Sequence, residues 1–320
     1  MKLTVNRIKH ILTEDIDSAQ RFDVATIDGF VSSCTSAAQN AIANAAPPGF
    51  TDFERDQLRH VIQGQRYSHL NIRSLLRNGE TPESVDALAI ARLQLETLYS
   101  FCFMLQDAEN VRVFLKHGWK KKYIRFLLQR EEYKNLVRFR EFFETQALPS
   151  LERLQQMSGV TEEEKLSIEY EQLGVTPPPG FKIATIRQFP TPRIIIREIR
   201  DPDRKGMLER LYPEYEFLCS FAHGDSEATL FRAILDTHSE AQRFISRGQA
   251  EDFWQQHVAE TAILYSAISA VQAATEVAAI YPADVELLAK VTTAWSGLIK
   301  FTLLARPIWE RRAMKILPLI

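Results

Sequence analysis

The stretch Thr261-AILYSAISAVQAA-Thr275 contains no charged residue and is dominated by Ala and branched aliphatic residues. A membrane-spanning helix needs roughly 20 predominantly apolar residues, and this stretch is shorter and includes the polar residues Ser266, Ser269 and Gln272. We therefore predict that it is the central helix of a protein core and that the chain has no transmembrane segment.

Helix start and stop signals recur on both sides of this stretch. Thr51-Asp-Phe-Glu54 and Thr161-Glu-Glu-Glu164 have the form of a capping box, in which a Thr oxygen and a Glu carboxylate satisfy backbone N–H groups at the start of a helix. No segment combines strand-like alternation with the turn residues of a β-hairpin, and the chain has only 12 Gly among 320 residues. The sequence therefore predicts an all-α fold: a helical bundle with additional helices and no substantial β-sheet.

Capping, Pro and Gly signals mark the expected helix boundaries. An opening helix is expected to end at about Ala46. Further helices are expected over Thr51–Asn78, Thr81–Asp107, Glu109–Gly118, Trp119–Gly159, Thr161–Gly174, Lys205–His223, Glu227–Arg247, Gln249–Ile280 and Asp284–Ala305. The helix over Trp119–Gly159 is expected to kink at Pro149, and a short tail is expected after Pro307. Arg193–Ile199 contains three consecutive Ile residues and fits either a strand or one or two turns of buried helix, of which we favour helix.

A run of prolines marks the expected division of the chain. Pro177-Pro-Pro-Gly180 is the clearest linker. We predict an N-terminal helical part over 1–174, a Pro-rich linker over 175–192, and a C-terminal helical part over 193–320 that packs on the first part to complete one bundle.

The overall composition excludes several classes of protein. Hydrophobic residues make up 45% of the chain and charged residues 25%, which are the values of a globular protein and not of a disordered or collagen-like chain. The 39 basic and 41 acidic residues nearly cancel, so any attraction to nucleic acid or membrane must be local. Cys34, Cys102 and Cys219 are far apart, and charges interrupt Met1–His10, so the chain shows neither a disulfide pattern nor a signal-peptide core. We expect a cytoplasmic protein.

The common sequence signatures of catalytic sites are missing. The chain contains no Gly-x-Gly-x-x-Gly, no Gly-x-x-x-x-Gly-Lys-Ser/Thr, no Gly-x-Ser-x-Gly and no His-Glu-x-x-His. The His residues are scattered, so their spacing assembles no metal cluster. We expect neither a metal nor a cofactor.

Arg92 and Glu96 lie one turn apart in the apolar part of the helix expected over Thr81–Asp107. Arg before Glu is the weaker order for a local ion pair. A charge inside an apolar wall is costly unless it is paired and hydrogen-bonded, so we expect partners from other helices. Glu276, in the Ala-rich helix over Gln249–Ile280, needs a cation if it is buried. Arg92 is a candidate for that cation, and a place for Glu276 on a narrow solvent-exposed face is the alternative.

The helix expected over Lys205–His223 offers partners of the right kind for Arg92. The residues that share one face, at spacings of three and four, are Tyr212, Tyr215, Cys219 and His223, with Ser220 beside them. The candidate catalytic residues are therefore Arg92, Glu96, Tyr215 and His223. A buried polar network that only fixes the helices is the alternative interpretation.

The pattern Arg92-x3-Glu96 followed by Tyr215-x4-Ser220-x2-His223-Gly224 resembles an uncharacterised, mainly bacterial family of all-α domains that is itself similar to HEPN (higher eukaryotes and prokaryotes nucleotide-binding) helical bundles. The resemblance implies a binding role linked to bacterial stress or defence. It also implies an alternative, a metal-independent RNA-processing enzyme. In that enzyme His223 would be the general acid/base, Tyr215 would donate or orient a proton, and Arg92 would stabilise phosphate charge.

The segment Arg112–Arg130 carries seven positive charges and no Asp or Glu. Its candidate nucleic-acid-binding residues are Lys116, Lys120, Lys121, Lys122 and Arg125, and the aromatic residues Trp119, Tyr123 and Phe126 lie among them. Phosphates of RNA or DNA are one expected partner, with the aromatic rings stacking on bases. The alternatives are an acidic protein partner, a membrane surface, and the protein's own Glu162, Glu163 and Glu164.

The function therefore stays open between a helical binding or interaction protein, an RNA-processing enzyme and a non-catalytic nucleic-acid binder. The apolar region Trp295–Trp309 fits either a homodimer interface or part of the core.

Overall fold

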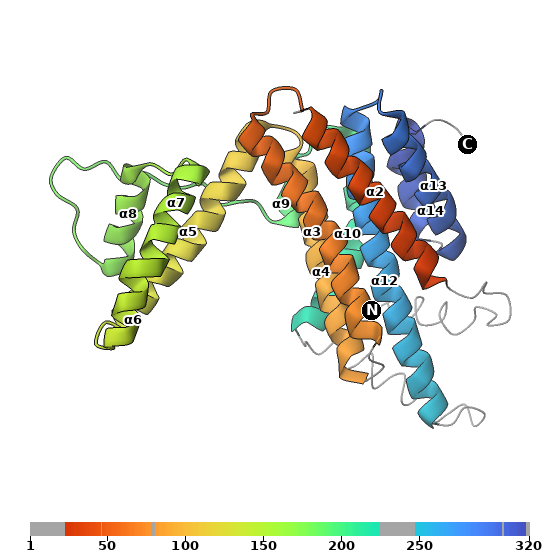
Figure 1. Ribbon diagram of the computed structural model, residues 1–320, viewed down its shortest axis with the longest axis horizontal. Coiled ribbons are helices and arrows are strands. Elements are labelled where there is room, and N and C mark those ends of the chain that lie inside the picture. Colours follow the sequence, from red (N-terminus) through yellow and green to blue (C-terminus); the bar gives the residue numbers. More distant parts are fainter. Residues whose placement is uncertain (1–22, 46, 78–80, 224–246, 303, 318–320) are drawn as a thin grey trace. The chain divides into compact units, whose positions relative to one another are not determined.

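The computed structural model describes residues 23–317 with the exception of 46, 78–80, 224–246 and 303. Every regular element in this part of the chain is a helix, and no strand occurs within it (Figure 1). The all-α prediction is therefore confirmed.

Among the described residues, short turns separate most of the helices, and a longer non-helical segment lies between α8 and α9. In chain order they are α2 (Val24–Asn44), α3 (Asp52–Arg77), α4 (Thr81–Met104), α5 (Ala108–Glu132), α6 (Val137–Phe142), the π-helical turn η1 (Phe143–Ala147), α7 (Leu148–Ser158), α8 (Glu162–Leu173), α9 (Pro192–Glu198), α10 (Pro202–His223), α12 (Arg247–Ile280), α13 (Val285–Phe301), α14 (Ala305–Ile308), the π-helical turn η2 (Trp309–Ala313) and α15 (Met314–Ile316).

The chain forms two compact units. The first unit consists of Met1–Ala38, Ile62–Leu95 and Pro213–Ile320, and the second of Gln39–Val61 and Glu96–Tyr212. The proline-rich segment expected as a linker, 175–192, lies within the second unit.

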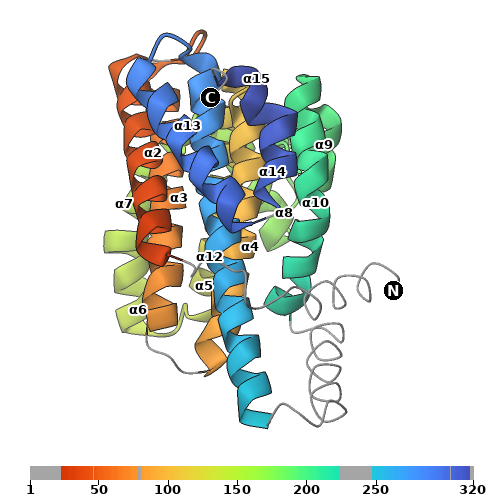
Figure 2. The same ribbon diagram turned by 90° about the vertical axis from the view of Figure 1, so that its right-hand side faces the viewer.

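α12 is the core helix of the first unit. Its segment Val258–Ile280 could cross a membrane by length and composition alone, but 83% of its most apolar window is buried inside the protein. Such burial is what the sequence predicts for a core helix. Figure 2 shows α12 with α13 beside it, and the hydrogen bonds described below link α12 to α3 and α4.

An aromatic cluster forms the core of α5, α7 and α8 in the second unit. The rings of Trp119 and Tyr123 stack with their centroids 4.6 Å apart, and the Trp119 indole N–H donates to the carbonyl of Leu151 at 3.0 Å. Phe126 packs edge-on against Phe143 of η1 at 5.7 Å. All five side chains are buried, so these helices are held together mainly by apolar contact.

Both predicted capping boxes are present. Thr51 N–H donates to Glu54 Oε2 at 2.9 Å, and Glu54 N–H donates to Thr51 Oγ1 at 3.4 Å. The corresponding distances between Thr161 and Glu164 are 2.9 and 3.2 Å. Gly174 ends α8 with φ of 65°, a left-handed conformation that Gly adopts without steric strain. The helix favoured for the segment with three Ile residues is confirmed as α9.

Two predicted helix boundaries in the second unit are wrong. α5 runs without a break through Gly118 and ends at Glu132. A single Gly inside a helix costs only about 1 kcal/mol, which the apolar packing of α5 offsets. The helix expected over Trp119–Gly159 is interrupted at 133–136, between α5 and α6, and Pro149 lies at the start of α7, directly after the π-helical turn η1.

The end of the chain also differs from the prediction. Residues 308–316 form the last part of α14, η2 and α15, where a short tail was expected. Pro307 lies in the first turn of α14, where proline is compatible with a helix. The helix predicted over Glu227–Arg247 falls almost entirely on residues outside the described part of the chain.

Candidate functional site

Arg92 of α4 contacts two side chains of α10 within the first unit. Its Nη2–H donates to the Tyr215 hydroxyl at 3.1 Å, and its Nε–H donates to the Cys219 Sγ at 3.4 Å. The guanidinium carbon also lies 5.4 Å from the centre of the Tyr215 ring, where the π face attracts a cation. The structure thus brings together two of the residues that the sequence analysis selected.

The other residues of the pattern are Glu96, Ser220 and His223. Glu96, one turn further along α4, belongs to the second unit and is partly buried, and its carbonyl accepts the Ser100 hydroxyl at 3.0 Å. His223 is the last residue of α10, and its side chain lies outside the described residues. Ser220 donates to the carbonyl of Phe217 at 2.7 Å, so its hydroxyl satisfies its own helix.

Replacing Arg92 by Ala is expected to lower the free energy of unfolding by about 1–2 kcal/mol, because the Tyr215 hydroxyl and ring lose their cationic partner. Thermal unfolding measures the change. Tyr215→Phe keeps the ring and removes only the hydroxyl, so this matched variant should lose less stability. An unchanged unfolding midpoint in Arg92→Ala would exclude a structural role for the contact.

A second polar group lies inside the first unit. His69 of α3 contacts Ser266 Oγ of α12 through Nδ1 at 2.8 Å and Asp28 Oδ1 of α2 through Nε2 at 3.0 Å. Arg73 Nε–H lies 3.0 Å from both carboxylate oxygens of Asp28. Burial alone would raise the pKa of Asp28, but the hydrogen bonds from His69 and Arg73 outweigh burial and lower that pKa below its ordinary value. Asp28 is therefore ionised at neutral pH.

Ser266, His69 and Asp28 together have the composition of a nucleophilic catalytic triad, but the burial of Ser266 and His69 does not suit catalysis. Ser266 and His69 are both 0% exposed. A nucleophile must reach its substrate, so this buried group is better suited to linking α2, α3 and α12 than to catalysis.

Gln65 of α3 and Gln94 of α4 form a pair of reciprocal hydrogen bonds next to the contact between Ser266 and His69. Gln65 Nε2 donates to the Gln94 carbonyl at 3.1 Å, and Gln94 Nε2 donates to the carbonyls of Gln65 at 2.9 Å and Ser266 at 3.1 Å. Ser269 Oγ lies 3.1 Å from both Gln65 Oε1 and the Gln94 carbonyl. All four side chains are buried, so α12 is linked to α3 and α4 at two neighbouring polar positions.

Glu276 of α12 is fully buried and pairs with Arg312 of η2, so the suggested partner Arg92 is wrong. Arg312 Nε and Nη2 donate to the two carboxylate oxygens at 2.8 Å each, the bidentate geometry that a guanidinium allows. Gln272 Nε2 adds a donor at 2.9 Å. The sequence analysis missed this partner because Arg312 follows Pro307, in a segment expected to be a short tail.

The other buried polar contacts were missed as well, although their spacing carries a signal. Gln65 and His69 are four residues apart on α3, and Ser266, Ser269 and Gln272 are three apart on α12. Each set lies on one face of its helix. A contact between the polar faces of α3 and α12 could therefore have been predicted from these spacings.

The first two cations of the basic segment are paired inside the second unit. Arg112 Nε–H donates to Glu54 at 2.7 Å and its Nη1–H to Glu109 at 3.4 Å. Lys116 Nζ lies 2.9 and 3.0 Å from the two carboxylate oxygens of Glu164, one of the three internal partners that the sequence offered. Internal pairing therefore accounts for these two positive charges.

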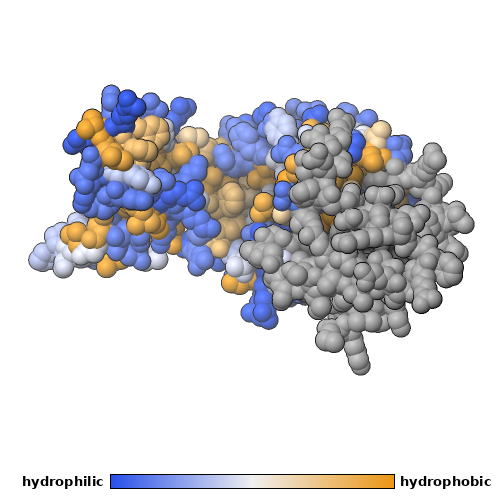
Figure 3. Space-filling view, turned by 90° about the horizontal axis from the view of Figure 1, so that it is seen from below, coloured by the Kyte–Doolittle hydropathy of each residue, from blue (hydrophilic) through white to orange (hydrophobic). Residues whose placement is uncertain are grey.

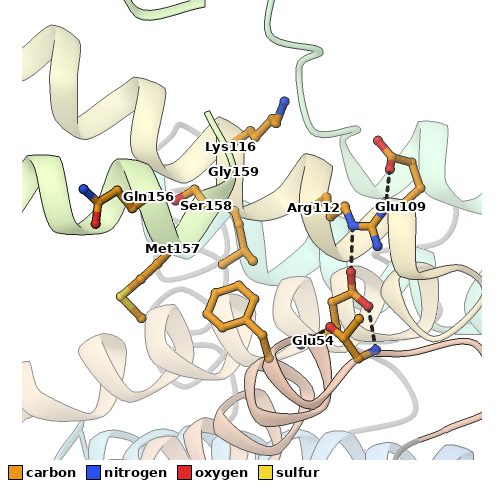
Figure 4. Close-up of a pocket in the computed structure, with 11 residues that line it drawn as sticks. Glu54, Glu109, Arg112, Lys116, Gln156, Met157, Ser158 and Gly159 are labelled. Carbon is orange, nitrogen blue, oxygen red and sulfur yellow. Dashed lines mark hydrogen bonds and ion pairs between the residues drawn. The ribbon is translucent and has the colours of Figure 1, made fainter. Parts of the chain in front are cut away.

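These ion pairs border a cavity of about 340 Å³, drawn in Figure 4. α3 contributes Glu54 to its wall, α5 contributes Arg112 and Lys116, and the end of α7 contributes Met157. Figure 4 shows the Arg112 guanidinium between the carboxylates of Glu54 and Glu109. The charged groups of this wall already have partners, so the cavity offers a ligand no unpaired charge.

The aromatic residues of the basic segment do not stack on bases. Trp119, Tyr123 and Phe126 are at most 5% exposed and belong to the aromatic core of the second unit. Burial, and then a hydrogen bond to Glu169, raise the pKa of Tyr123. The expectation that these rings are available to nucleic acid is therefore wrong.

The middle cations of α5 face the solvent. Lys121, Lys122 and Arg125 are exposed, Lys120 is partly exposed, and none of the four has an ion pair with a described residue. Burial, and then the charges of Lys121 and Lys120, lower the pKa of His117, so this imidazole is neutral at pH 7. α5 thus has an aromatic inner side and a cationic outer side.

In the described part of the chain, the fold and these contacts define an all-α protein with buried polar links and a cationic surface on α5. Comparisons with protein-family models, with curated proteins and with solved structures find no match to this chain. The arrangement of its own side chains is therefore the basis for a functional assignment.

Proposed function

We propose that the protein is a cytoplasmic helical binding protein and that the outer side of α5 binds an acidic protein partner. The observation that carries the proposal is the group of exposed cations Lys121, Lys122 and Arg125, which have no ion pair with a described residue. Like charges on one helix surface repel one another. Carboxylates of a partner would relieve that repulsion and would be attracted over some distance.

Two features favour a protein partner over a nucleic acid. Lys116, on the same helix, already holds both carboxylate oxygens of Glu164, which lies in the first turn of α8, so α5 binds an acidic helix end within its own unit. Leu128 is 56% exposed and lies three residues after Arg125, hence on the same side of α5. An apolar side chain next to cations suits a protein surface better than a phosphate backbone.

The buried polar groups of the first unit support binding over catalysis. His69 and Ser266 are closed off from solvent, and so are Glu276 and Arg312. The resemblance to a HEPN-related bacterial family extends the proposal to a role in stress or defence. The same resemblance supplies the competing hypothesis, RNA processing through His223.

A fluorescently labelled poly-glutamate peptide is a suitable probe. Wild-type protein is expected to bind it, in fluorescence anisotropy, with an affinity that falls as salt is added. Lys121→Ala/Lys122→Ala should weaken binding roughly tenfold, because two of the exposed cations are removed. Lys290→Ala/Lys300→Ala removes two exposed lysines of α13 and is the matched control, which should bind like the wild type.

Equal binding by the two double variants would contradict the proposal. A single-stranded RNA oligonucleotide in the same assay tests the nucleic-acid alternative. RNA binding that is tighter than peptide binding and is lost in the α5 variant would replace the acidic protein by nucleic acid. RNA that is cleaved in the presence of a chelator by the wild type, but not by His223→Ala, would replace the binding role by an enzymatic one.

A further inference from the structure

His117 lies on the cationic side of α5, and the proposed function does not use it. It precedes Lys121 by four residues and Arg125 by eight, so the three side chains follow one another along one side of the helix. Lys120, three residues after His117, is its other neighbour on the next turn. His117 is partly buried, whereas Lys121 and Arg125 are exposed. An imidazole therefore lies beside the cations that we assign to an acidic partner.

The charged groups that other elements bring to α5 are engaged elsewhere. Three carboxylates from these elements each pair with a different side chain of α5: Glu164 of α8 with Lys116, Glu169 of α8 with Tyr123, and Glu54 of α3 with Arg112. On α7, the charged residues Glu152 and Arg153 are exposed. In the segment after α8, Phe189 contacts Phe114, one turn before His117, and the charged residue nearest to Phe189 in sequence, Arg187, pairs with Glu198.

The neighbouring lysines disfavour a positive charge on His117. Burial, and then the charges of Lys121 and Lys120, lower the pKa of this imidazole below its ordinary value. Carboxylates that bind to these lysines would offset their repulsion and would themselves attract an imidazolium. The pKa of His117 would therefore be higher in the complex than in the unbound protein.

We propose that His117 regulates the α5 surface by taking up a proton from the solvent when an acidic partner binds. This inference rests on the proposed function, because it needs carboxylates at Lys121. The protonated imidazole would add a positive charge to the group of Lys121, Lys122 and Arg125. Histidine suits this role because its charge changes between pH 5 and 8.

The direction of the pH dependence follows from linkage. The complex holds more protons than the unbound protein, so binding tightens as the pH falls. The increase begins when the pH falls through the pKa of His117 in the complex, and it ends below the pKa of His117 in the unbound protein, where the imidazole is already charged. Figure 3 shows hydrophilic side chains, in blue, over much of the surface of α5–α8, where water and salt screen charges. We therefore expect a moderate change in the pKa of about one unit, which corresponds to a roughly tenfold change in affinity.

Fluorescence anisotropy with a labelled poly-aspartate peptide tests the pH dependence between pH 5.5 and 8 at constant ionic strength. Asp carboxyls have an ordinary pKa of about 3.9, so the peptide stays ionised over this range. Wild-type protein is expected to bind roughly tenfold more tightly at pH 5.5 than at pH 8. His117→Gln keeps a polar side chain that cannot be protonated, so its affinity should stay nearly constant. His60→Gln removes an exposed histidine of α3 in the same unit and is the matched control, which should follow the wild type.

Nuclear magnetic resonance of the histidine rings provides an independent measurement. The signal that is missing in His117→Gln identifies His117 in the wild type, and its titration gives the pKa of this imidazole with and without the peptide. The peptide is expected to raise this pKa. Far-UV circular dichroism at each pH verifies that the variants are folded.

Two results would overturn this inference and leave the proposed function intact, provided that Lys121→Ala/Lys122→Ala still weakens binding. The first is a folded His117→Gln protein with the same pH dependence as the wild type. The second is a pKa of His117 that does not change when the peptide binds. A wild type that does not bind the peptide at any pH would overturn both the inference and the proposed function.

Discussion

Replacing Arg312 by Met is expected to lower the free energy of unfolding by about 3–5 kcal/mol, because the Glu276 carboxylate is left in the core without its cation. Glu276 is 0% exposed, and Arg312 donates to both of its carboxylate oxygens. Met retains much of the apolar stem of Arg, so the loss reports the missing charge more than a cavity. Urea denaturation followed by circular dichroism measures the change.

Two further variants define the origin of that loss. Arg306→Met removes the cation of an exposed pair with Glu310, whose side chains are 69% and 48% accessible, and should change stability by less than about 0.5 kcal/mol. Glu276→Leu/Arg312→Met removes both buried charges and should recover most of the loss, because neither charge then lacks a partner. A small effect of Arg312→Met, or no recovery in the double variant, would argue against a buried ion pair.

Replacing Trp295 by Ala is expected to cost about 3–5 kcal/mol of stability through the cavity that the indole leaves. Trp295 is 0% exposed, and its Nε1–H donates to Thr275 Oγ1 of α12 at 2.9 Å. The hydroxyl of Thr275 would also lose its indole donor. Chemical denaturation measures the loss, and the folded variant should keep the sedimentation behaviour of the wild type.

The matched control lies on the same helix. Val285 is 76% exposed, so Val285→Ala should change the free energy of unfolding by less than about 0.5 kcal/mol. The sequence left the region Trp295–Trp309 open between core and homodimer interface, and the burial of Trp295, Leu298 and Ile308 favours the core. A Trp295→Ala protein that keeps its stability but loses an oligomer would reverse that assignment.

Features of the fold that depend on local sequence could be predicted. The capping boxes at Thr51 and Thr161 involve residues three positions apart, so the sequence contains both partners of each hydrogen bond. The core position of α12 is also predicted from one stretch of chain, the uncharged residues 261–275, but the helical segment Val258–Ile280 is long enough to cross a membrane, and its burial is what assigns it to the core. The all-α class is the sum of such local signals.

Features that depend on contact between distant segments could not be predicted in the same way. The distribution of charges along the chain shows that Glu276 needs a cation, but many arginines could meet that need, and only the fold brings Arg312 to it. The composition of α5 similarly mixes aromatic and basic residues. Packing against α7 and α8 decides that Trp119 and Tyr123 point inward while Lys121 points to solvent.

The hydrogen bond between Ser266 and His69 also determines how α12 is aligned along its neighbouring helices. Ala side chains are small and uniform. An Ala-rich helix can therefore shift along its neighbours with little loss of apolar contact. A shift of one turn, about 5.4 Å, would place Ala262 or Ala270 opposite His69 in the position of Ser266, and the imidazole would have no hydroxyl to bind. A few polar atoms thus select one alignment among several that volume alone would permit.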